Sequence, residues 1–384
     1  MSYNGYRLVL LLGIISMLGD FVYEGGRSVL PDYMRQLGLD AIAVGSALGF
    51  AEFMGWVSRP IGGFIADRTG RYDLIVKLGY GGLIVIPLMA LTPWVLPIIL
   101  LAVAERVLRG LRIPARDAML ARRRGDVGLG TAFGIHELLD QVGATLGPLL
   151  AIVVLSTLHS IEAVFLAMTI PYVMLLASLT RLPKHVEHAE ASYNLKPSRR
   201  ILLYSVVVGL NSAGLLPASL VLYMVSVETG AGSWLVPAAY TLAMVIDAAT
   251  GLAMGKAFDR WGGVVVVAGI GVSFLPALLV NTPIPLLMLC ASLVGVAVGA
   301  QETVFRALVA QLAERDGLGS SYAYYGLALG AGAAVAGTVY GYMIESGTPT
   351  VFVAAYAAML QLTAGIMLMS LLKRLGNLRF FSKY

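Results

Sequence analysis

A short charged turn stands between two long apolar segments, and a second copy of this turn recurs later in the chain. The two copies read Gly63-Phe-Ile-Ala-Asp67-Arg68-Thr-Gly70-Arg71 and Gly255-Lys-Ala-Phe-Asp259-Arg260-Trp-Gly262. They start 192 residues apart, which is half of the 384 residues in the chain. A turn that recurs at half the chain length predicts a protein made of two similar halves.

Long apolar runs fill most of the remaining sequence. The chain is 58% hydrophobic and 13% charged, whereas a soluble domain carries about 25% charged residues. Continuous runs of about 20 apolar residues are typical of helices that cross a lipid bilayer. The sequence therefore predicts an all-α membrane protein with twelve transmembrane helices in two pseudo-symmetric bundles. We expect the spans at residues 8–36, 41–66, 74–93, 96–120, 128–156, 161–182, 201–226, 233–257, 263–281, 284–311, 319–344 and 349–372.

Residues 184–200 form a long polar stretch, and we expect them to be a cytoplasmic linker. The linker would separate an N-terminal six-helix bundle, residues 1–183, from a C-terminal six-helix bundle, residues 201–384. The stretch from Gly110 to Ala121 also aligns with Gly299 to Ala310 at an offset of 189 residues. Parallel repeats of six spans are typical of transporters that bind substrate between their halves, near the middle of the membrane.

Basic residues gather in alternate loops. Twelve spans would place Arg68, Arg122, the linker and the C-terminal tail on one side, while Glu228 and Glu345 fall on the other. Lys and Arg are enriched in cytoplasmic loops. We therefore expect a multi-pass protein of the cell membrane with both termini in the cytoplasm.

Several motifs together resemble the major facilitator superfamily. The first turn resembles the signature loop between spans two and three of that superfamily, and the second turn resembles its weaker copy between spans eight and nine. Arg106-Val-Leu-Arg109-Gly110 resembles the R-x-x-x-G motif that the family associates with proton transfer. Gly143-Ala-Thr-Leu-Gly147-Pro148-Leu-Leu-Ala151 resembles the G-x-x-x-G-P-x-x-G motif of proton-driven drug exporters, with Ala151 in place of the last glycine.

The resemblance implies roles for the two turns and for span five. The turns would latch the cytoplasmic side shut in one state through Gly63, Asp67, Arg68, Gly70, Arg71, Asp259 and Arg260. Asp67 is expected to cap a neighbouring helix or to pair with an arginine, and Gly70 permits the backbone angle of a tight turn. Gly147 and Pro148 are expected to bend span five, because proline removes a helix hydrogen bond.

Many charged residues fall inside the predicted spans, although each costs about 2.5–3.5 kcal/mol at the bilayer centre. At the helical spacing, Asp20, Glu24 and Arg27 share one face of span one. Two interpretations stay open: the charges form ion pairs that only hold helices together, or they form a proton relay whose pairings change as the halves rock. The candidates for proton coupling are Asp20, Glu24, Arg106, Glu137, Asp140 and Asp247.

A second set of polar residues is suited to binding a substrate. Span four carries arginines on one face that would bind an anion, and span ten carries an acid and a base one turn apart that form either a local pair or a substrate contact. Asn211 either lines a cavity or is packed in the interior. The candidates for substrate binding are Arg109, Arg112, Arg116, Glu302, Arg306 and Asn211.

The sequence contains no nucleotide-binding motif, catalytic constellation or nucleic-acid-binding module. We therefore expect a monomeric transporter in the lipid bilayer, not an enzyme, with a small-molecule substrate, no cofactor and no metal. The favoured function is secondary active transport by alternating access, as proton-coupled antiport that exports small amphipathic or cationic compounds. The alternative is proton-coupled uptake of an anionic metabolite bound by the span-four arginines. A lipid-handling enzyme would need a catalytic constellation, and a sensor would need a large soluble domain.

Overall fold

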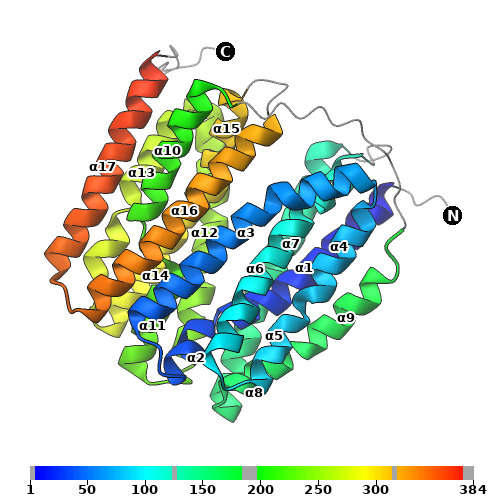
Figure 1. Ribbon diagram of the computed structural model, residues 1–384, viewed down its shortest axis with the longest axis horizontal. Coiled ribbons are helices and arrows are strands. Elements are labelled where there is room, and N and C mark those ends of the chain that lie inside the picture. Colours follow the sequence, from blue (N-terminus) through cyan, green and yellow to red (C-terminus); the bar gives the residue numbers. More distant parts are fainter. Residues whose placement is uncertain (1–4, 123–127, 184–196, 314–317, 375–384) are drawn as a thin grey trace. The chain divides into compact units, whose positions relative to one another are not determined.

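The computed structural model describes residues 5–122, 128–183, 197–313 and 318–374. Within these ranges the chain forms helices and no strand (Figure 1). Helices satisfy every backbone hydrogen bond within one segment, which is what a chain surrounded by lipid requires. The apolar runs of the sequence therefore appear as helices.

The helices gather into two compact units. The first unit comprises Met1–Leu37, Met54–Ala191 and Gly232–Ala238, and the second unit comprises Gly38–Phe53, Ser192–Ala231 and Ala239–Tyr384. Two helices, α3 (Ala41–Thr69) and α12 (Leu235–Trp261), supply residues to both units. Most of the predicted linker, residues 184–196, lies outside the described residues, so the predicted boundary at 184–200 stays a prediction.

The other helices belong to one unit each. Those of the first unit are α1 (Gly5–Arg27), α2 (Leu30–Gln36), α4 (Tyr72–Gly81), η1 (Gly82–Ile84), α5 (Val85–Leu88), η2 (Met89–Leu91), α6 (Val95–Arg122), α7 (Leu129–Leu158), α8 (Ile161–Ala167) and α9 (Thr169–Leu179). Those of the second unit are α10 (Arg199–Gly214), α11 (Ala218–Thr229), α13 (Val264–Val272), η3 (Leu275–Leu279), α14 (Ile284–Ala300), the π-helical η4 (Gln301–Phe305), α15 (Arg306–Leu312), α16 (Leu318–Glu345) and α17 (Thr350–Arg374).

Ten stretches of the described residues are long and apolar enough to cross a membrane. They are Tyr6–Gln36, Ala41–Thr69, Tyr72–Leu91, Thr131–Leu158, Ile161–Leu179, Arg199–Thr229, Leu235–Trp261, Ile284–Leu312, Leu318–Glu345 and Thr350–Arg374. Each overlaps a predicted span. The other two predicted spans correspond to α6, which is long but heavily charged, and to Val264–Leu279, which is apolar but shorter.

Glycines allow neighbouring helices to pack backbone against backbone. A Cβ atom added at Gly143 or Gly147 on α7 would collide with the backbone of α1, at Met17 and Phe21. In the second unit, α10 lies beside α16 (Figure 1), and a Cβ atom at Gly332 would collide with the backbone of α10. Small residues at helix interfaces are how membrane helices approach closely.

The two copies of the charged turn have the same backbone geometry. Gly70 has φ 66° and Gly262 has φ 61°, so both adopt the left-handed conformation that glycine reaches without strain. Each glycine N–H bonds to the carbonyl four residues earlier, at 2.9 Å for Gly70 and 2.7 Å for Gly262. Each turn is therefore a helix end of the kind that glycine commonly terminates.

Most of each turn motif lies on a helix and not in a loop. Asp67 and Arg68 belong to the last turn of α3, and Asp259 and Arg260 to the last turn of α12. Asp67 Oδ1 accepts a hydrogen bond from the Tyr72 hydroxyl at 2.6 Å. This contact ties the end of α3 to the start of α4. The latch role of these residues stays a prediction.

The first predicted span breaks at a different place from the one expected. Glycine and proline weaken helices, so an interruption of this span is expected at Gly25-Gly26 and Pro31. The helix α1 nevertheless continues through both glycines to Arg27. The break falls at Ser28 and Val29, and Pro31 lies in the first turn of α2, where its missing N–H costs nothing. On α7 the helix is continuous through Pro148, so the expected bend at Gly147 and Pro148 stays a prediction.

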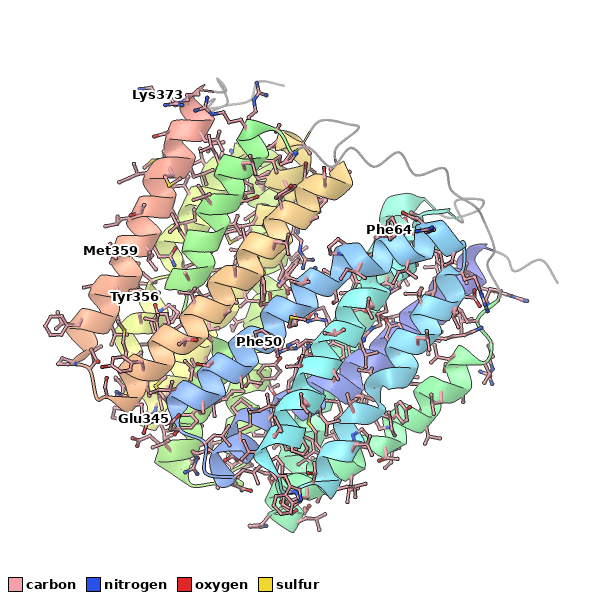
Figure 2. All side chains as sticks on the ribbon, viewed as in Figure 1. Phe50, Phe64, Glu345, Tyr356, Met359 and Lys373 are labelled. Carbon is pink, nitrogen blue, oxygen red and sulfur yellow. The ribbon has the colours of Figure 1, made fainter. Side chains whose placement is uncertain are left out.

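Apolar side chains cover much of the outside of the second unit. Figure 2 shows Met359 on α17, where its side chain is 58% exposed. Leu362 and Ile366 follow on the same helix, at 66% and 59% exposed. Large exposed apolar residues at helical spacing are what a lipid-facing helix surface presents.

Candidate functional site

The charged faces of α1 and α6 meet inside the first unit. Arg27 on α1 donates to both carboxylate oxygens of Glu105 on α6, at 2.8 Å from Nη2 to Oε1 and 3.2 Å from Nε to Oε2. Arg27 also pairs with Glu24 one turn earlier, at 3.2 Å from Nη1 to Oε1. All three residues are buried. A buried pair such as this leaves an uncompensated charge when either partner is removed.

Two tyrosine rings lie against the remaining arginines of α6. The guanidinium carbon of Arg112 is 4.2 Å from the centre of the Tyr80 ring and 5.4 Å from that of Tyr23. The guanidinium carbon of Arg109 is 5.0 Å from the centre of the Tyr23 ring. Arg112 is 1% exposed, and its Nε and Nη1 atoms have no hydrogen-bond partner among the described residues. Ring faces therefore stabilise this buried cation where a carboxylate contact is absent.

A second set of contacts joins α7 to α1, α4 and α6. Asp140 Oδ2 lies 3.2 Å from His136 Nδ1 and 3.4 Å from Arg116 Nη1. Arg116 Nη1 also donates to Ser16 Oγ at 3.0 Å, and the Tyr80 hydroxyl donates to the same oxygen at 2.8 Å. One chain of polar contacts therefore runs across four helices.

We call these side chains the interior cluster. It comprises Ser16, Asp20, Tyr23, Glu24 and Arg27 of α1, Tyr80 of α4, Glu105, Arg109, Arg112 and Arg116 of α6, and His136 and Asp140 of α7.

Asp20 differs from the other acids of the interior cluster. It is 8% exposed, and within the described part of the chain it makes no hydrogen bond or ion pair. Two acids, Asp140 and Glu24, and two arginines, Arg109 and Arg112, are near enough to act on it electrostatically. A buried acid without a close partner is more easily protonated than one held in an ion pair. Asp20 is therefore chemically suited to bind and release a proton.

The structure brings most, but not all, of the predicted proton-coupling residues of this unit together. Arg106 is adjacent to the interior cluster, with its Nη1 atom 3.3 Å from Glu105 Oε2 and its side chain 17% exposed. Glu137 is exposed and accepts a hydrogen bond from Gln141 Nε2 at 3.2 Å. The described contacts of Glu137 therefore do not include the interior cluster, and its proton-carrying role stays a prediction.

Six members of the interior cluster were not among the predicted site residues: Ser16, Tyr23, Arg27, Tyr80, Glu105 and His136. Arg27 and Glu105 stand at helical spacing from the predicted residues Glu24 and Arg109. Ser16 and Tyr23 stand four residues before and three residues after Asp20, so helical spacing could have found them. His136 stands four residues before Asp140 and carries the same signal. Tyr80 lies alone in an apolar run of α4, and nothing in the sequence indicates that its hydroxyl reaches α1.

The second unit holds a network of amides where the first holds charges. Asn211 on α10 is fully buried and donates to Gln361 Oε1 on α17 at 2.7 Å. Gln301 Nε2 donates to Asn211 Oδ1 at 2.7 Å, and Gln361 Nε2 returns a bond to the Asn211 carbonyl at 2.9 Å. Gln301 and Gln361 were not among the predicted residues. Their signal in the sequence is a lone amide in a long apolar run.

Gln301 is also the first residue of a π-helical segment, Gln301–Phe305. Three tyrosine hydroxyls bond to backbone carbonyls in or beside it: Tyr325 to Gln301 at 3.1 Å, Tyr204 to Phe305 at 3.0 Å and Tyr322 to Arg306 at 3.1 Å. These hydroxyls add hydrogen bonds from α10 and α16 to the backbone of the π-helical segment and of the residue that follows it. π-helical turns of this kind are frequent at functional sites.

The other predicted residues of the second unit do not join the amide network in the contacts described. Asp247 on α12 is buried, and its carboxylate lies next to Gly299 on α14. Glu302 is exposed and Arg306 is half-buried. Within the described residues no group of three or more His, Cys, Asp or Glu side chains is placed to hold a metal ion.

Comparison with known proteins identifies a family model and several relatives. The model described as Major Facilitator Superfamily matches residues 9–264. An uncharacterized protein of Mycobacterium tuberculosis is 32% identical over 389 residues, which cover 96% of this chain and 93% of the relative. An uncharacterized MFS-type transporter of Methanocaldococcus jannaschii is 29% identical over 146 residues, covering 38% of this chain and 36% of the relative.

Solved transporter structures share the fold. The nucleoside transporter NupG superposes with a TM-score of 0.74 at 15% sequence identity, covering 96% of this chain and 99% of NupG. A POT family transporter in complex with 5-aminolevulinic acid gives a TM-score of 0.74 at 13% identity and covers 96% of both chains. At these identities the likeness concerns the fold alone.

Proposed function

The chain belongs to the major facilitator superfamily and is a secondary transporter, and on this premise we propose that it couples substrate movement to protons. The family and its structural neighbours are transporters and not enzymes. The substrate is therefore a small molecule, and the protein works while embedded in a membrane. The driving ion, the direction of transport and the substrate class make up the proposal.

We include twelve spans in the proposal. The segment α6 has 28 residues, enough to cross a bilayer, and three of the charges that lower its hydropathy, Glu105, Arg112 and Arg116, contact α1, α4 or α7. Val264–Leu279 is apolar throughout. With these two stretches the ten candidate spans become twelve. An even number of spans places both termini on one side of the membrane, and the basic loops support the cytoplasm as that side. We propose the cell membrane as the location.

The observation that carries proton coupling is the environment of Asp20. It is a buried acid without a hydrogen bond or ion pair among the described residues, and Asp140 and Arg109 act on it electrostatically. Protonation removes its repulsion from Asp140 and its attraction to Arg109. The energy of the interior cluster therefore changes with the proton. Coupling requires that this change differ between the conformations of the transport cycle, and we propose that it does.

Export by antiport is the direction that we favour. The span-five motif places Gly143 and Gly147 of α7 directly on the backbone of α1, beside Asp20 and Glu24. The motif resembles that of proton-driven drug exporters, and here it holds the helix that carries the titrating acids. We propose that the substrates are small amphipathic or cationic compounds, which compete with protons for an acidic interior.

Uptake of an anionic metabolite is the second candidate, and Arg112 favours it. Two of its nitrogens have no hydrogen-bond partner in the described structure, although the side chain is almost fully buried. A carboxylate or phosphate is a strong partner for such a guanidinium. Arg116 is less available, because it already contacts Asp140 and Asp117.

Proteoliposomes that enclose a pH-sensitive dye distinguish the two candidates. With no ATP present, efflux of an enclosed cationic drug is expected to acidify the interior, and Asp20→Asn and Asp140→Asn are expected to abolish the signal. The matched control is Glu162→Gln on α8, an acid that hydrogen-bonds Ser160 and lies outside the interior cluster.

An organic acid provides the opposing arm of the experiment. Uptake of the acid that acidifies the interior, and that Arg112→Gln abolishes, would replace export with anion symport. No proton movement with any cationic drug or organic acid, while the compounds still exchange across the membrane, would exclude proton coupling.

A further inference from the structure

Four buried polar atoms of the interior cluster have no hydrogen-bond partner among the described residues. They are Nε and Nη1 of Arg112, Nε2 of His136 and Oδ1 of Asp140. Buried polar groups in native proteins nearly always have a partner, which is often an ordered water molecule. A buried polar atom left unpaired costs about 1–3 kcal/mol. Several such atoms in one place therefore indicate molecules that complete the site.

The three residues belong to one connected set of side chains. His136 Nδ1 contacts Asp140 Oδ2 at 3.2 Å, and Arg116 contacts the same oxygen at 3.4 Å. Arg116 reaches Tyr80 through Ser16 Oγ, and the Tyr80 ring lies 4.2 Å from the guanidinium carbon of Arg112. The unpartnered atoms therefore belong to one connected set of side chains on α1, α4, α6 and α7.

Water satisfies this set of atoms better than an ion does. The Arg112 nitrogens are donors, Asp140 Oδ1 is an acceptor, and His136 Nε2 is an acceptor when the imidazole is neutral and donates through Nδ1. An anion would satisfy the arginine but would face the Asp140 carboxylate, and a cation would do the reverse. Water donates and accepts, so it can serve all four atoms.

We propose that buried water occupies this region and that His136 binds the transported proton and passes it to Asp140. A proton enters from water at Nε2, and the Nδ1–H proton moves to Asp140 Oδ2. The imidazole is then neutral with its proton on Nε2, and Asp140 is a neutral acid. This inference rests on proton coupling and adds His136, which the sequence did not indicate as a site residue.

Proton transfer to Asp140 changes the charge balance around it. Arg116 loses its charged partner on α7 but keeps Asp117, and Asp20 loses a nearby like charge. The charged groups that act on Asp140 from other helices are Asp20 of α1 and Arg116 of α6. Arg116 in turn contacts Asp117 of α6 and interacts with Tyr80 of α4, whose ring lies against Arg112. Because these groups lie on three other helices, the proton position alters contacts between helices.

The histidine content makes the proposal testable at a single residue. The chain has four histidines. His159 ends α7 in a left-handed conformation, and His185 and His188 lie outside the described residues. A variant with His159→Gln, His185→Gln and His188→Gln leaves His136 as the one histidine in the full-length chain.

NMR of 15N-histidine in that variant, in lipid nanodiscs, measures proton binding directly. Nδ1 of His136 is expected to resonate as a protonated ring nitrogen that donates to the Asp140 carboxylate, and Asp140→Asn is expected to change its chemical shift. His136 nitrogens whose resonances are the same with and without Asp140→Asn would overturn the proposal.

Transport provides a readout that separates this inference from the proposed function. Proton flux in proteoliposomes is expected to fall at least tenfold in His136→Gln with a shifted pH profile, and to stay unchanged in His159→Gln. If protons move with substrate equally well in His136→Gln, the relay is wrong and proton coupling stands. If the unmodified protein moves no protons, both proton coupling and the relay are wrong, whatever the NMR result for His136.

Discussion

The arginines of the interior cluster are compensated in different ways. Arg27 makes three hydrogen bonds to Glu105 and one to Glu24. Arg116 forms ion pairs with Asp117 and Asp140, whereas the Arg112 guanidinium lies against the Tyr80 ring. A buried charge without a partner destabilises the fold. Substitution of an acid should therefore lower the free energy of unfolding most where its arginine is buried and depends on that acid. The pair between Arg27 and Glu105 should matter most for stability.

Replacement of Glu105 by Gln tests the stability of this pair. The substitution leaves Arg27 with Glu24 as its remaining described carboxylate, and it should lower the free energy of unfolding by about 3–5 kcal/mol. The matched control on the same helix is Asp117→Asn, whose side chain is 40% exposed and whose loss should cost at most about 1 kcal/mol. Thermal unfolding in detergent measures both. Equal losses of stability in the two variants would show that the pair between Arg27 and Glu105 is not a major source of stability.

Helical spacing predicts which residues share a face, but it does not predict their partners. The faces of α1 and α6 followed from positions such as Asp20, Glu24, Arg109 and Arg112, and the structure does bring those two faces together. Which acid pairs with which arginine depends on how far each helix rotates and slides against its neighbour. The sequence of one helix does not specify its rotation or its position along a neighbouring helix. Arg27 thus contacts Glu105, a pairing that spacing alone left open.

At the scale of elements, α1 and α7 form a contact that depends on glycine. Gly143 and Gly147 stand one helical turn apart and leave room for the α1 backbone at Met17 and Phe21. The resemblance of this segment to an exporter motif gave no physical reason for the glycines. The structure supplies one, because any side chain there would separate the helices that carry Asp20 and Asp140.

Substitution of Gly143 by Ala tests this contact. The added Cβ would meet the α1 backbone, which cannot move as a flexible side chain can, so the variant should lose about 1–3 kcal/mol of stability. The matched control is Gly134→Ala on the same helix, where a Cβ atom has nothing within 4 Å. That change should be neutral or should stabilise the helix by up to about 1 kcal/mol. If Gly143→Ala and Gly134→Ala have the same unfolding midpoint, the α1–α7 contact at Gly143 does not require glycine.

Local irregularities of the helices were the least predictable elements. The π-helical segment Gln301–Phe305 contains no proline or glycine that would have predicted an irregularity. Its carbonyls are satisfied by tyrosines of α10 and α16, at Tyr204 and Tyr325, which are distant in sequence. The break after α1 shows the same limit, since two glycines stay helical and the chain breaks one residue after Arg27. Tertiary contacts decide such details.

At the scale of the whole molecule, the duplication is clear in the turns and weak in the interiors. Gly70 and Gly262 have the same backbone conformation and the same hydrogen bond. Hydropathy also predicted where nearly all helices lie. It could not predict that α3 divides between the two units, because nothing in the apolar pattern of residues 41–69 separates its two parts. Contacts between helices set that division.

The buried polar residues of the two units differ in charge. The first unit buries Asp20, Glu24, Arg27, Asp32, Asp73, Glu105, Arg112 and His136. The described part of the second unit buries one charged residue, Asp247, together with the amides of Asn211, Gln301 and Gln361. Amides do not change charge between pH 5 and 8. Proton binding should therefore belong to the first unit, and the second unit should contribute hydrogen bonds to a substrate.

The proton-to-substrate ratio of transport tests this division of roles. Asp20→Asn in the first unit should lower the ratio, because it removes an ionisable group from the interior cluster. Gln301→Met in the second unit should weaken substrate binding by about fivefold at an unchanged ratio, since one hydrogen bond is worth about 1 kcal/mol. Asp247→Asn is the sharpest comparison, because it removes the buried charge of the second unit while it keeps the shape of the side chain. Simultaneous measurement of proton flux and substrate flux in proteoliposomes gives the ratio for each variant. A lower ratio in Asp247→Asn would mean that both units bind protons and that the roles are not divided between them.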